Sequence, residues 1–269
     1  MAITREIWLN SLVETLFADN SFAQRLTNHS AFTDGKKVHV PNAGTPPTVA
    51  KNRSTFPATV GTRTDADLSY DLDAFTTDPI RIPKVDEYEL SYDKRSSVTE
   101  QARRALVDAV YLNVLTTLAT TCATGNKSVQ ATFGKAAMKA IRTNFDKANV
   151  PATGRCVVLT PEAYMDLLGD LTDAEAMAFT GSADAAQGKV GTLYGFEVFE
   201  RSKIDSTASS KVNSIAFQTD SVSCALGATD LFVDEGSATM YGDVISAQVR
   251  AGGAIIRSDK AGVYVTTTA

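Results

Sequence analysis

Residues 36–93 constrain the fold more than any other segment, because they have the pattern of extended chain with little to bury among themselves. Val38 and Val40 alternate with polar residues, and from 67 to 74 aspartate or serine alternates with leucine, tyrosine or alanine. This period of two is typical of strands with one apolar face. An isolated hairpin of such strands is only marginally stable in water. We therefore predict a long irregular hairpin, with strands at 67–75 and 88–92, that lies on another surface, either of the same subunit or of a neighbour.

A long helix is predicted directly after this segment. Ser97 and Glu100 have the spacing of a capping box, in which each side chain satisfies a backbone donor at a helix start. Apolar residues then recur at helical spacing from Val98 to Leu118, and Gly125 with Asn126 stops the pattern. A helix over 97–121 is roughly 40 Å long. Because this exceeds the usual length of a globular helix, it suggests an architectural spine.

The rest of the chain is predicted to form a compact region of mixed helix and strand. Residues 133–148 have helical spacing, 156–159 form an apolar run typical of a buried strand, and Thr160 followed by Pro161 starts a third helix. This order indicates an α+β or α/β core. Residues 172–191, rich in Ala, Gly, Ser and Asp, are predicted to be a long loop. Further strands are expected at 195–199, 214–217, 255–257 and 263–265.

The composition fits a folded protein of one large domain or two smaller ones. The chain has 269 residues, 43% of them hydrophobic, and 26 basic against 31 acidic residues give a net charge of −5. Such a balance offers no basic surface for tight binding of nucleic acid. No apolar run approaches the ~18 residues of a membrane helix, and the first residues lack the apolar core of a signal peptide. We expect no membrane partner, and we expect Cys122, Cys156 and Cys224 to be buried thiols in a reducing compartment.

Patterns that carry catalysis or hold a metal are nearly absent. The two histidines, His29 and His39, lie near the N-terminus without a second ligand at metal spacing. No phosphate-binding loop, dinucleotide motif or nucleophile elbow has the required spacing. The aspartates between 65 and 73 indicate a solvated strand face and not a calcium loop. We predict no catalytic, cofactor-binding or metal-binding residues and no enzymatic role; a hydrolase or transferase that relies on Asp, Glu, Lys or Tyr alone is the distant alternative.

The N-terminal segment, residues 1–35, carries aromatic side chains at helical spacing in a short amphipathic piece. Such side chains pack either on the subunit's own core or on a neighbour, and the sequence favours neither. Our candidate subunit-interface residues combine three groups. They are the aromatic residues of this segment, the apolar residues of the one-faced strands, and two arginines that lie off the apolar stripe of the long helix. These are Trp8, Phe17, Phe22, Leu68, Tyr70, Leu72, Tyr88, Tyr92, Arg103 and Arg104.

Three short motifs and the order of the segments point to a known family. Residues 155–164 (RCVVLTPEAY) give a strand that runs into a short helix, and 191–198 (GTLYGFEV) follow after a gap. Residues 242–245 lead into 252–257, which begin with a glycine pair. In these motifs and in segment order the whole chain resembles the major capsid proteins of tailed double-stranded DNA bacteriophages, which share the Hong Kong 97-like shell fold.

The resemblance implies an α+β, Hong Kong 97-like capsid fold in four parts. These are an N-terminal arm (1–35), an extended β-hairpin loop or E-loop (36–93), a peripheral domain with the spine helix (94–124 and 231–254), and a compact axial domain (125–230 and 255–269). In this family the axial domains gather around five- and six-fold axes, and the E-loop lies on the adjacent subunit. Assembly would then cover the one-faced hairpin.

The same resemblance implies a structural function. The subunit is expected to self-assemble through pentamers and hexamers into an icosahedral or prolate head, which encloses DNA without sequence-specific binding. Assembly is expected in the host bacterial cytoplasm, and the final location is the virion. Because the arm is short and begins with Met1, we expect a separate scaffolding protein and no cleavage of this subunit. A portal and decoration proteins are further expected partners, no cofactor is expected, and an encapsulin-like nanocompartment shell is the alternative with the same fold.

Overall fold

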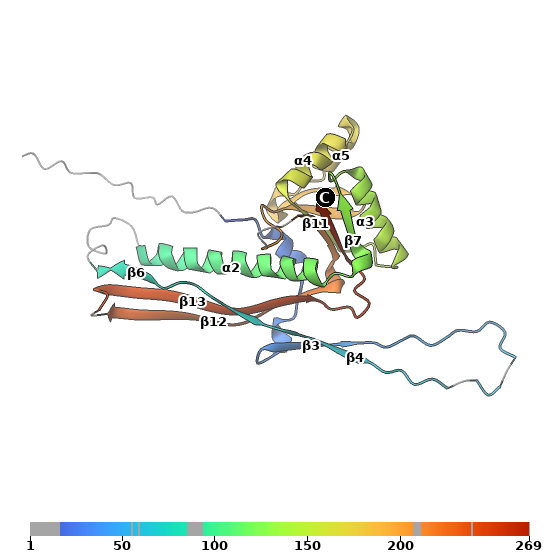
Figure 1. Ribbon diagram of the computed structural model, residues 1–269, viewed down its shortest axis with the longest axis horizontal. Coiled ribbons are helices and arrows are strands. Elements are labelled where there is room, and N and C mark those ends of the chain that lie inside the picture. Colours follow the sequence, from blue (N-terminus) through green and yellow to red (C-terminus); the bar gives the residue numbers. More distant parts are fainter. Residues whose placement is uncertain are drawn as a thin grey trace, which may run out of the picture.

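The computed structural model describes residues 17–54, 56–58, 60–84, 94–206, 211–237 and 239–268. It has an elongated platform, in which one long helix lies along a long β-hairpin, and a compact lobe of helices and strands near one end of that platform (Figure 1). A thin hairpin projects from below the lobe. Within the described residues, no helix has the length and apolar character needed to cross a membrane.

The platform is a sheet built around one long strand and covered by one long helix. Its elements are β1 (Thr27–Asn28), β5 (Asp73–Thr76), β6 (Ile80–Pro83), β12 (Val222–Ser237), β13 (Gly242–Ile255) and helix α2 (Lys94–Thr121). β12 pairs with one edge of β13, whereas β5 and β6 pair in turn with the other edge. Leu106 and Val110 of α2 pack on alternate residues of β13, namely Ala247, Val249 and Ala251.

A glycine pair allows β13 to be approached closely on both faces. A Cβ built on Gly253 would lie 2.8 Å from Cγ1 of Val114 on α2. A Cβ built on Gly252 would lie 2.6 Å from the carbonyl oxygen of Asp71 on the other side. Both distances are shorter than a side chain tolerates, so glycine is required for this packing. The glycine pair of the 252–257 motif therefore fixes how closely the helix and the projecting hairpin lie on the platform.

Helix α2 ends at Thr121 as predicted, but its start differs from the prediction. The helix runs from Lys94, so Ser97 lies within it and the predicted capping box is wrong. Glu100 instead accepts hydrogen bonds from Arg103 and Arg104, one turn further along. These guanidinium groups lower the pKa of the Glu100 carboxyl to about 2. The capping-box spacing of Ser97 and Glu100 was ambiguous, because a glutamate inside a helix can instead pair with arginines three and four residues after it.

The compact lobe is a six-stranded sheet with three helices on one face and the end of α2 on the other. Its strands are β7 (Lys127–Gln130), β8 (Arg155–Leu159), β9 (Lys189–Leu193), β10 (Phe196–Glu200), β11 (Val212–Gln218) and β14 (Val263–Thr268), and its helices are α3 (Lys135–Lys147), α4 (Pro161–Asp170) and α5 (Asp173–Thr180). The strand order is β7-β14-β11-β8-β10-β9. β8 is buried throughout, as predicted. Val157 and Leu159 lie in the core with α3 and α4, whereas Cys156 and Val158 lie in the core with α2.

Two predictions for the compact lobe are wrong. Residues 172–191 are not a long loop, because they form α5 and then β9. The Glu175 carboxylate accepts hydrogen bonds from the Thr172 backbone N–H at 3.0 Å and from the Thr172 hydroxyl at 2.8 Å, and buried Phe179 anchors the helix. Ala and Gly hid these elements because they contribute little to a periodic apolar pattern. Likewise, no strand spans 255–257, because Ile255 ends β13.

The predicted hairpin over 36–93 is divided between two sheets. β2 (Thr33–Asp34), β3 (Lys37–Asn42) and β4 (Ala66–Asp71) form a small antiparallel sheet. The predicted strand at 67–75 breaks at buried Leu72, after which β5 joins the platform. The predicted strand at 88–92 lies outside the described residues. Residues 43–65, between β3 and β4, form the end of the projection in Figure 1, and we call them the hairpin tip.

A buried arginine ties the N-terminal segment, the platform and the lobe together. Arg201 follows β10, and its side chain is 0% exposed. Its guanidinium donates to Oδ1 of Asp108 on α2 at 2.6 Å, to Oδ1 of Asn20 at 3.1 Å and to the carbonyl oxygen of Lys203. Burial lowers the pKa of Arg201, and the Asp108 carboxylate acts in the opposite direction. Acceptors from three segments thus bind the buried positive charge of Arg201.

The described chain also contains five short 3-10 helices. They are η1 (Ser21–Arg25), η2 (Ser30–Phe32), η3 (Thr124–Asn126), η4 (Ala185–Gln187) and η5 (Thr219–Ser221).

We predict that Asp108→Ala lowers the free energy of unfolding by about 3 to 5 kcal/mol, because the Arg201 charge stays buried without its carboxylate. Urea unfolding followed by circular dichroism measures the difference. Asp78→Ala, at an exposed carboxylate, is the control and is expected to change the value by less than about 0.5 kcal/mol. Equal effects of the two substitutions would contradict the role given to Arg201.

The three cysteines are free and buried, as the sequence predicted. Burial raises the pKa of Cys156 to about 12 and that of Cys122 and Cys224 to about 11. Because the thiolate is the reactive form, we predict that an alkylating reagent at mildly alkaline pH labels none of them in the native protein and all of them in urea. Intact-mass measurement reads the number of labels. Rapid labelling of any cysteine before unfolding would show that its site is open.

Candidate interaction surfaces

The described residues contain a histidine hydrogen-bonded to a serine, but the pair is closed to a substrate. Ser223 Oγ lies 2.7 Å from His29 Nδ1 and 2.7 Å from the Tyr70 hydroxyl. Ser223 is completely buried, so a substrate has no access to its oxygen and the constellation lacks the open site that nucleophilic catalysis needs. Its effect is structural, because Tyr70 on β4 is held to Ser223 on β12. The base of the projecting hairpin is thereby fixed to the platform.

The other histidine lies on a solvated strand face. His39 Nδ1 is 2.6 Å from Asp67 Oδ2 across the β3–β4 pair, and both side chains are more than half exposed. In the part of the chain that the structure describes, no group of three or more His, Cys, Asp or Glu side chains is placed to hold a metal ion.

Four of the predicted interface residues pack at least partly within the subunit itself. Phe22 is 1% exposed, and its ring lies edge-on to that of Tyr111 with centroids 5.9 Å apart. Leu72 is 4% exposed and lies in a small core beneath the hairpin. Leu68 and Tyr70 on β4 are half-buried. The surface that the sequence analysis required for the one-faced strand β4 is thus supplied in large part by the subunit's own platform.

The remaining predicted interface residues are exposed or undescribed. Phe17 is 37% exposed at the start of the described chain. Arg103 and Arg104 lie exposed on α2, where both bind Glu100. Trp8, Tyr88 and Tyr92 lie outside the described residues. A role in subunit contacts stays a prediction for all of these residues.

The hairpin tip exposes apolar side chains to water. Val49 is 92% exposed, Phe56 75% and Val60 94%. Sequence reasoning missed them because the region between the two strands has no periodic pattern, only turn-forming residues. Isolated exposed apolar residues are common on proteins, but three on one thin projection are a feature of contact surfaces.

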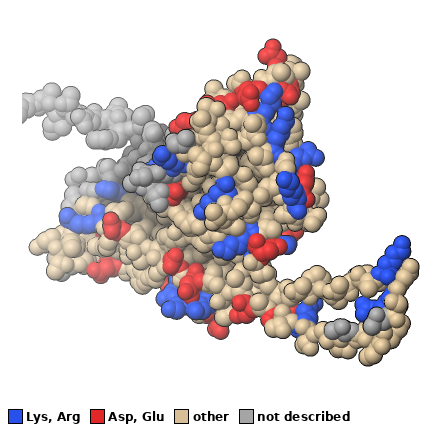
Figure 2. Space-filling model, turned by 45° about the vertical axis from the view of Figure 1, so that its right-hand side comes forward, with Lys and Arg blue, Asp and Glu red and all other residues tan. Residues whose placement is uncertain are grey.

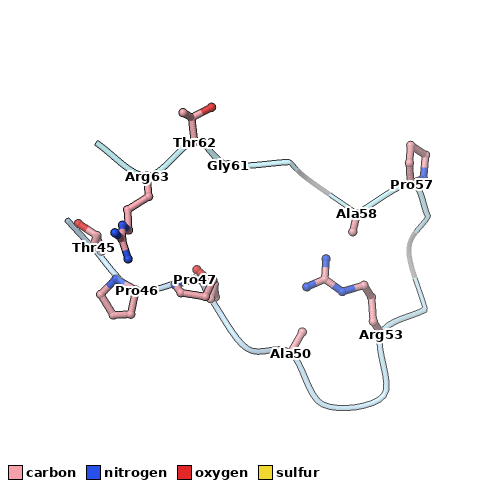
Figure 3. A pocket seen from close by; sticks show the side chains of 11 residues that line it. Thr45, Pro46, Pro47, Ala50, Arg53, Pro57, Ala58, Gly61, Thr62 and Arg63 are labelled. Atoms are coloured by element: carbon pink, nitrogen blue, oxygen red, sulfur yellow. The ribbon is translucent and has the colours of Figure 1, made fainter. Parts of the chain in front are cut away.

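The hairpin tip is also basic. Lys51, Arg53 and Arg63 are its cations and Asp65 is its only acid. Figure 3 shows that the side chains of Arg53 and Arg63 both point into the space that the loop of the tip encloses. This hollow has a volume of about 800 Å³ and is lined otherwise by Thr, Pro, Ala and Gly. Arg63 Nε lies 2.7 Å from Asp65 Oδ1, whereas Arg53 has no ion pair among the described residues. Figure 2 shows Lys and Arg side chains along the projection and at its far end.

The outer part of β12 is a second exposed apolar surface, with the opposite charge. Leu231 is 51% exposed, Phe232 52% and Val233 38%. Among the described strands only β1 pairs with the outer edge of β12, and only at Ser223 and Cys224, so no described strand covers this edge beside Leu231, Phe232 and Val233. The acidic residues around it are Asp230, Asp234 and Glu235, the last of which binds Arg95 at 2.6 Å.

No protein-family model and no curated protein sequence matches the chain. Solved structures that it resembles include capsids of phages and of a GTA particle. A structure of Mycobacterium phage Che8 has a TM-score of 0.71 at 21% identity and covers 98% of each chain. The capsid structure of cyanophage P-SCSP1u has a TM-score of 0.75 at 16% identity and covers 99% of this chain and 93% of that one.

The capsid of a native GTA particle is similar as well, with a TM-score of 0.71 at 12% identity over 99% of this chain and 96% of that one. Likeness at this level of identity defines the fold. The chain therefore has the α+β, Hong Kong 97-like fold of phage capsids, which confirms the fold class that the sequence resemblance implied.

We predict that replacing residues 43–65 by an Asn-Gly turn between Asn42 and Ala66 changes the free energy of unfolding by less than about 1 kcal/mol, since a shorter loop also costs less closure entropy. Asn42 and Ala66 already face each other across the β3–β4 pair, and nearly all described tip residues are exposed. Urea unfolding measures the change. A loss of more than about 3 kcal/mol would mean that the tip packs on its own subunit.

Proposed function

We propose that this chain is the major capsid protein of a tailed phage, a subunit that assembles with copies of itself into the head shell. The observation that carries the proposal is a capsid fold over at least 98% of the chain, combined with a thin projection whose apolar side chains the lone subunit leaves in water. Exposed apolar side chains on a projection favour contact with a partner, and in a shell subunit that partner is the neighbouring copy.

In this proposal each part of the subunit has its own place in the shell. Residues 1–35 are the N-terminal arm and 36–93 the E-loop. The peripheral domain comprises 94–124 and 231–254, with α2 as its spine. The axial domain comprises 125–230 and 255–269, and it gathers with its copies around the five-fold axes of pentamers and the six-fold axes of hexamers.

The hairpin tip of one copy suits the outer part of β12 on the next. The tip is basic and apolar, through residues such as Arg53 and Val60, and β12 is acidic and apolar around Phe232. Opposite charges orient such a contact, and burial of the apolar side chains stabilises it. Because the two patches differ, the contact is head-to-tail and closes into a ring when repeated around an axis.

The proposed partners and location follow from the same function. Pentamers and hexamers, a separate scaffolding protein, a portal and decoration proteins belong to the proposal, as does assembly in the host cytoplasm. The shell encloses DNA without reading its sequence, which agrees with the chain's net charge of −5. The comparisons support a structural role, and because the similar structures named above are phage and GTA capsids, they favour a phage head over an encapsulin-like compartment.

We predict that the purified protein forms capsomers or closed shells, and that the variant with residues 43–65 replaced by an Asn-Gly turn stays folded but does not. Size-exclusion chromatography and negative-stain microscopy read assembly, and urea unfolding verifies the fold of the variant. Val49→Ile, which keeps an apolar side chain on the tip, is the control and should assemble normally. A wild-type chain that remains monomeric under every assembly condition would falsify the proposal.

A further inference from the structure

Helices α4 and α5 form an acidic face on the compact lobe. The chain has no Lys or Arg between Arg155 and Lys189, a stretch that includes both helices. Glu175 is bound to Lys135 at 3.0 Å. In contrast, the exposed residues Glu162, Asp166 and Asp173 form no ion pair with any described residue. Figure 2 shows acidic side chains gathered along the top of the lobe.

The same face exposes large apolar side chains. Met165 on α4 is 64% exposed and Met177 on α5 is 75% exposed. Met165 lies directly before Asp166 and within one turn of Glu162, so apolar and acidic groups alternate over a small area. Two carboxylates at i and i+4 repel each other on a lone helix. A face with both exposed methionines and unpaired like charges is therefore better stabilised by a basic partner than by water.

Helix α3 presents the complementary face on another side of the lobe. Lys139, Arg142 and Lys147 are exposed, and only Arg142 has an ion-pair partner among the described residues, at 3.5 Å from Asp146. Ala136, one turn before Lys139, and Thr143, next to Arg142, are small exposed residues of the same helix. Figure 1 shows α3 running down one side of the lobe while α4 and α5 lie across its top and other side, and Figure 2 shows basic side chains along the α3 side.

We propose that the α4–α5 face of one copy docks on helix α3 of the next copy, so that the compact lobes form a ring by a repeated head-to-tail contact. This inference rests on the proposed shell function and names the surfaces through which the lobes meet. Two different faces on one lobe are what a cyclic assembly requires, because each copy must offer one face to each neighbour. The two faces have opposite charge, which selects this pairing over two like faces.

The side chains of helix α3 suit the α4–α5 face chemically. Lysine and arginine have long apolar stems that cover apolar surface while the charged end reaches a carboxylate. The stems of Lys139 and Arg142 would cover Met165 and Met177, and their charges would meet Asp166 and Asp173. The small residues Ala136 and Thr143 beside these basic positions would leave room for the methionine side chains.

Charge reversal on each face tests the contact. One variant carries Asp166→Lys and Asp173→Lys, a second carries Lys139→Glu and Arg142→Glu, and a third combines all four substitutions. The expected result is that each of the first two loses more than about tenfold of its assembled fraction, since like charges then face each other. The combined variant regains assembly, because both faces are reversed on every copy. Asp166→Glu with Lys139→Arg keeps every charge and is the matched control.

The outcomes separate this inference from the proposed function. If the wild type assembles and the first two variants assemble equally well, the α3 to α4–α5 contact is refuted while the shell function stands. If those two variants fail and the combined variant, verified as folded by urea unfolding, fails as well, the faces meet a different partner, such as a separate basic protein, and the inference is refuted. If the wild type itself never assembles, the shell function is refuted first.

Discussion

The packing of helix α2 against two sheets at once is the constraint on which the rest of the structure depends. Leu106 and Val110, near its middle, pack on β13 of the platform. Leu115 and Leu118 in its second half lie in a core that also contains Val158 of the lobe sheet. One rigid helix therefore joins the two parts of the subunit, and the buried charge pair between its Asp108 and Arg201 adds a polar link at the junction.

Because α2 is fixed in this way, the surfaces of the subunit are held in a defined relation to one another. The hairpin is anchored at its base by the Tyr70–Ser223 hydrogen bond, while the hairpin tip extends into solvent. The acidic and basic faces lie on the compact lobe, above the projecting hairpin in Figure 1. A molecule built in this way exposes several separate surfaces and has no enclosed catalytic site among its described residues. That distribution suits the shell function proposed above, in which each copy must touch several neighbours at set angles.

Much of the fold was predictable where a local pattern and the tertiary environment agree. The buried strand β8, the helix that follows Thr160 and the end of α2 at Thr121 all lie where the apolar spacing and the capping residues placed them. The start of α2 was not predictable, because Glu100 pairs with Arg103 and Arg104 instead of capping a helix. Helix α5 was missed because its small residues give almost no periodic signal, although Thr172 and Glu175 have the capping spacing that would have located it.

The candidate surfaces were less predictable than the core. Period-two alternation correctly indicated that β4 is apolar on one side, but it left open whether the strand's own subunit or a neighbour covers that side. The structure shows that the subunit itself covers much of it, at Leu72 and Tyr70. The exposed residues of the hairpin tip and of α4–α5 carried no signal, because exposure depends on which segments happen not to be covered.

The sequence by itself determined the class of this protein: an α+β chain with a one-faced hairpin, a long spine helix, buried thiols and no catalytic pattern. These properties follow from local periodicity and residue chemistry, which neighbouring residues along the chain specify. Only the tertiary structure decided which apolar residues are buried inside the subunit and which stay exposed on its surface. The physical reason is that burial is a long-range property: Phe22 and Val60 are both apolar in the sequence, but the first meets Tyr111 of α2 and the second meets water.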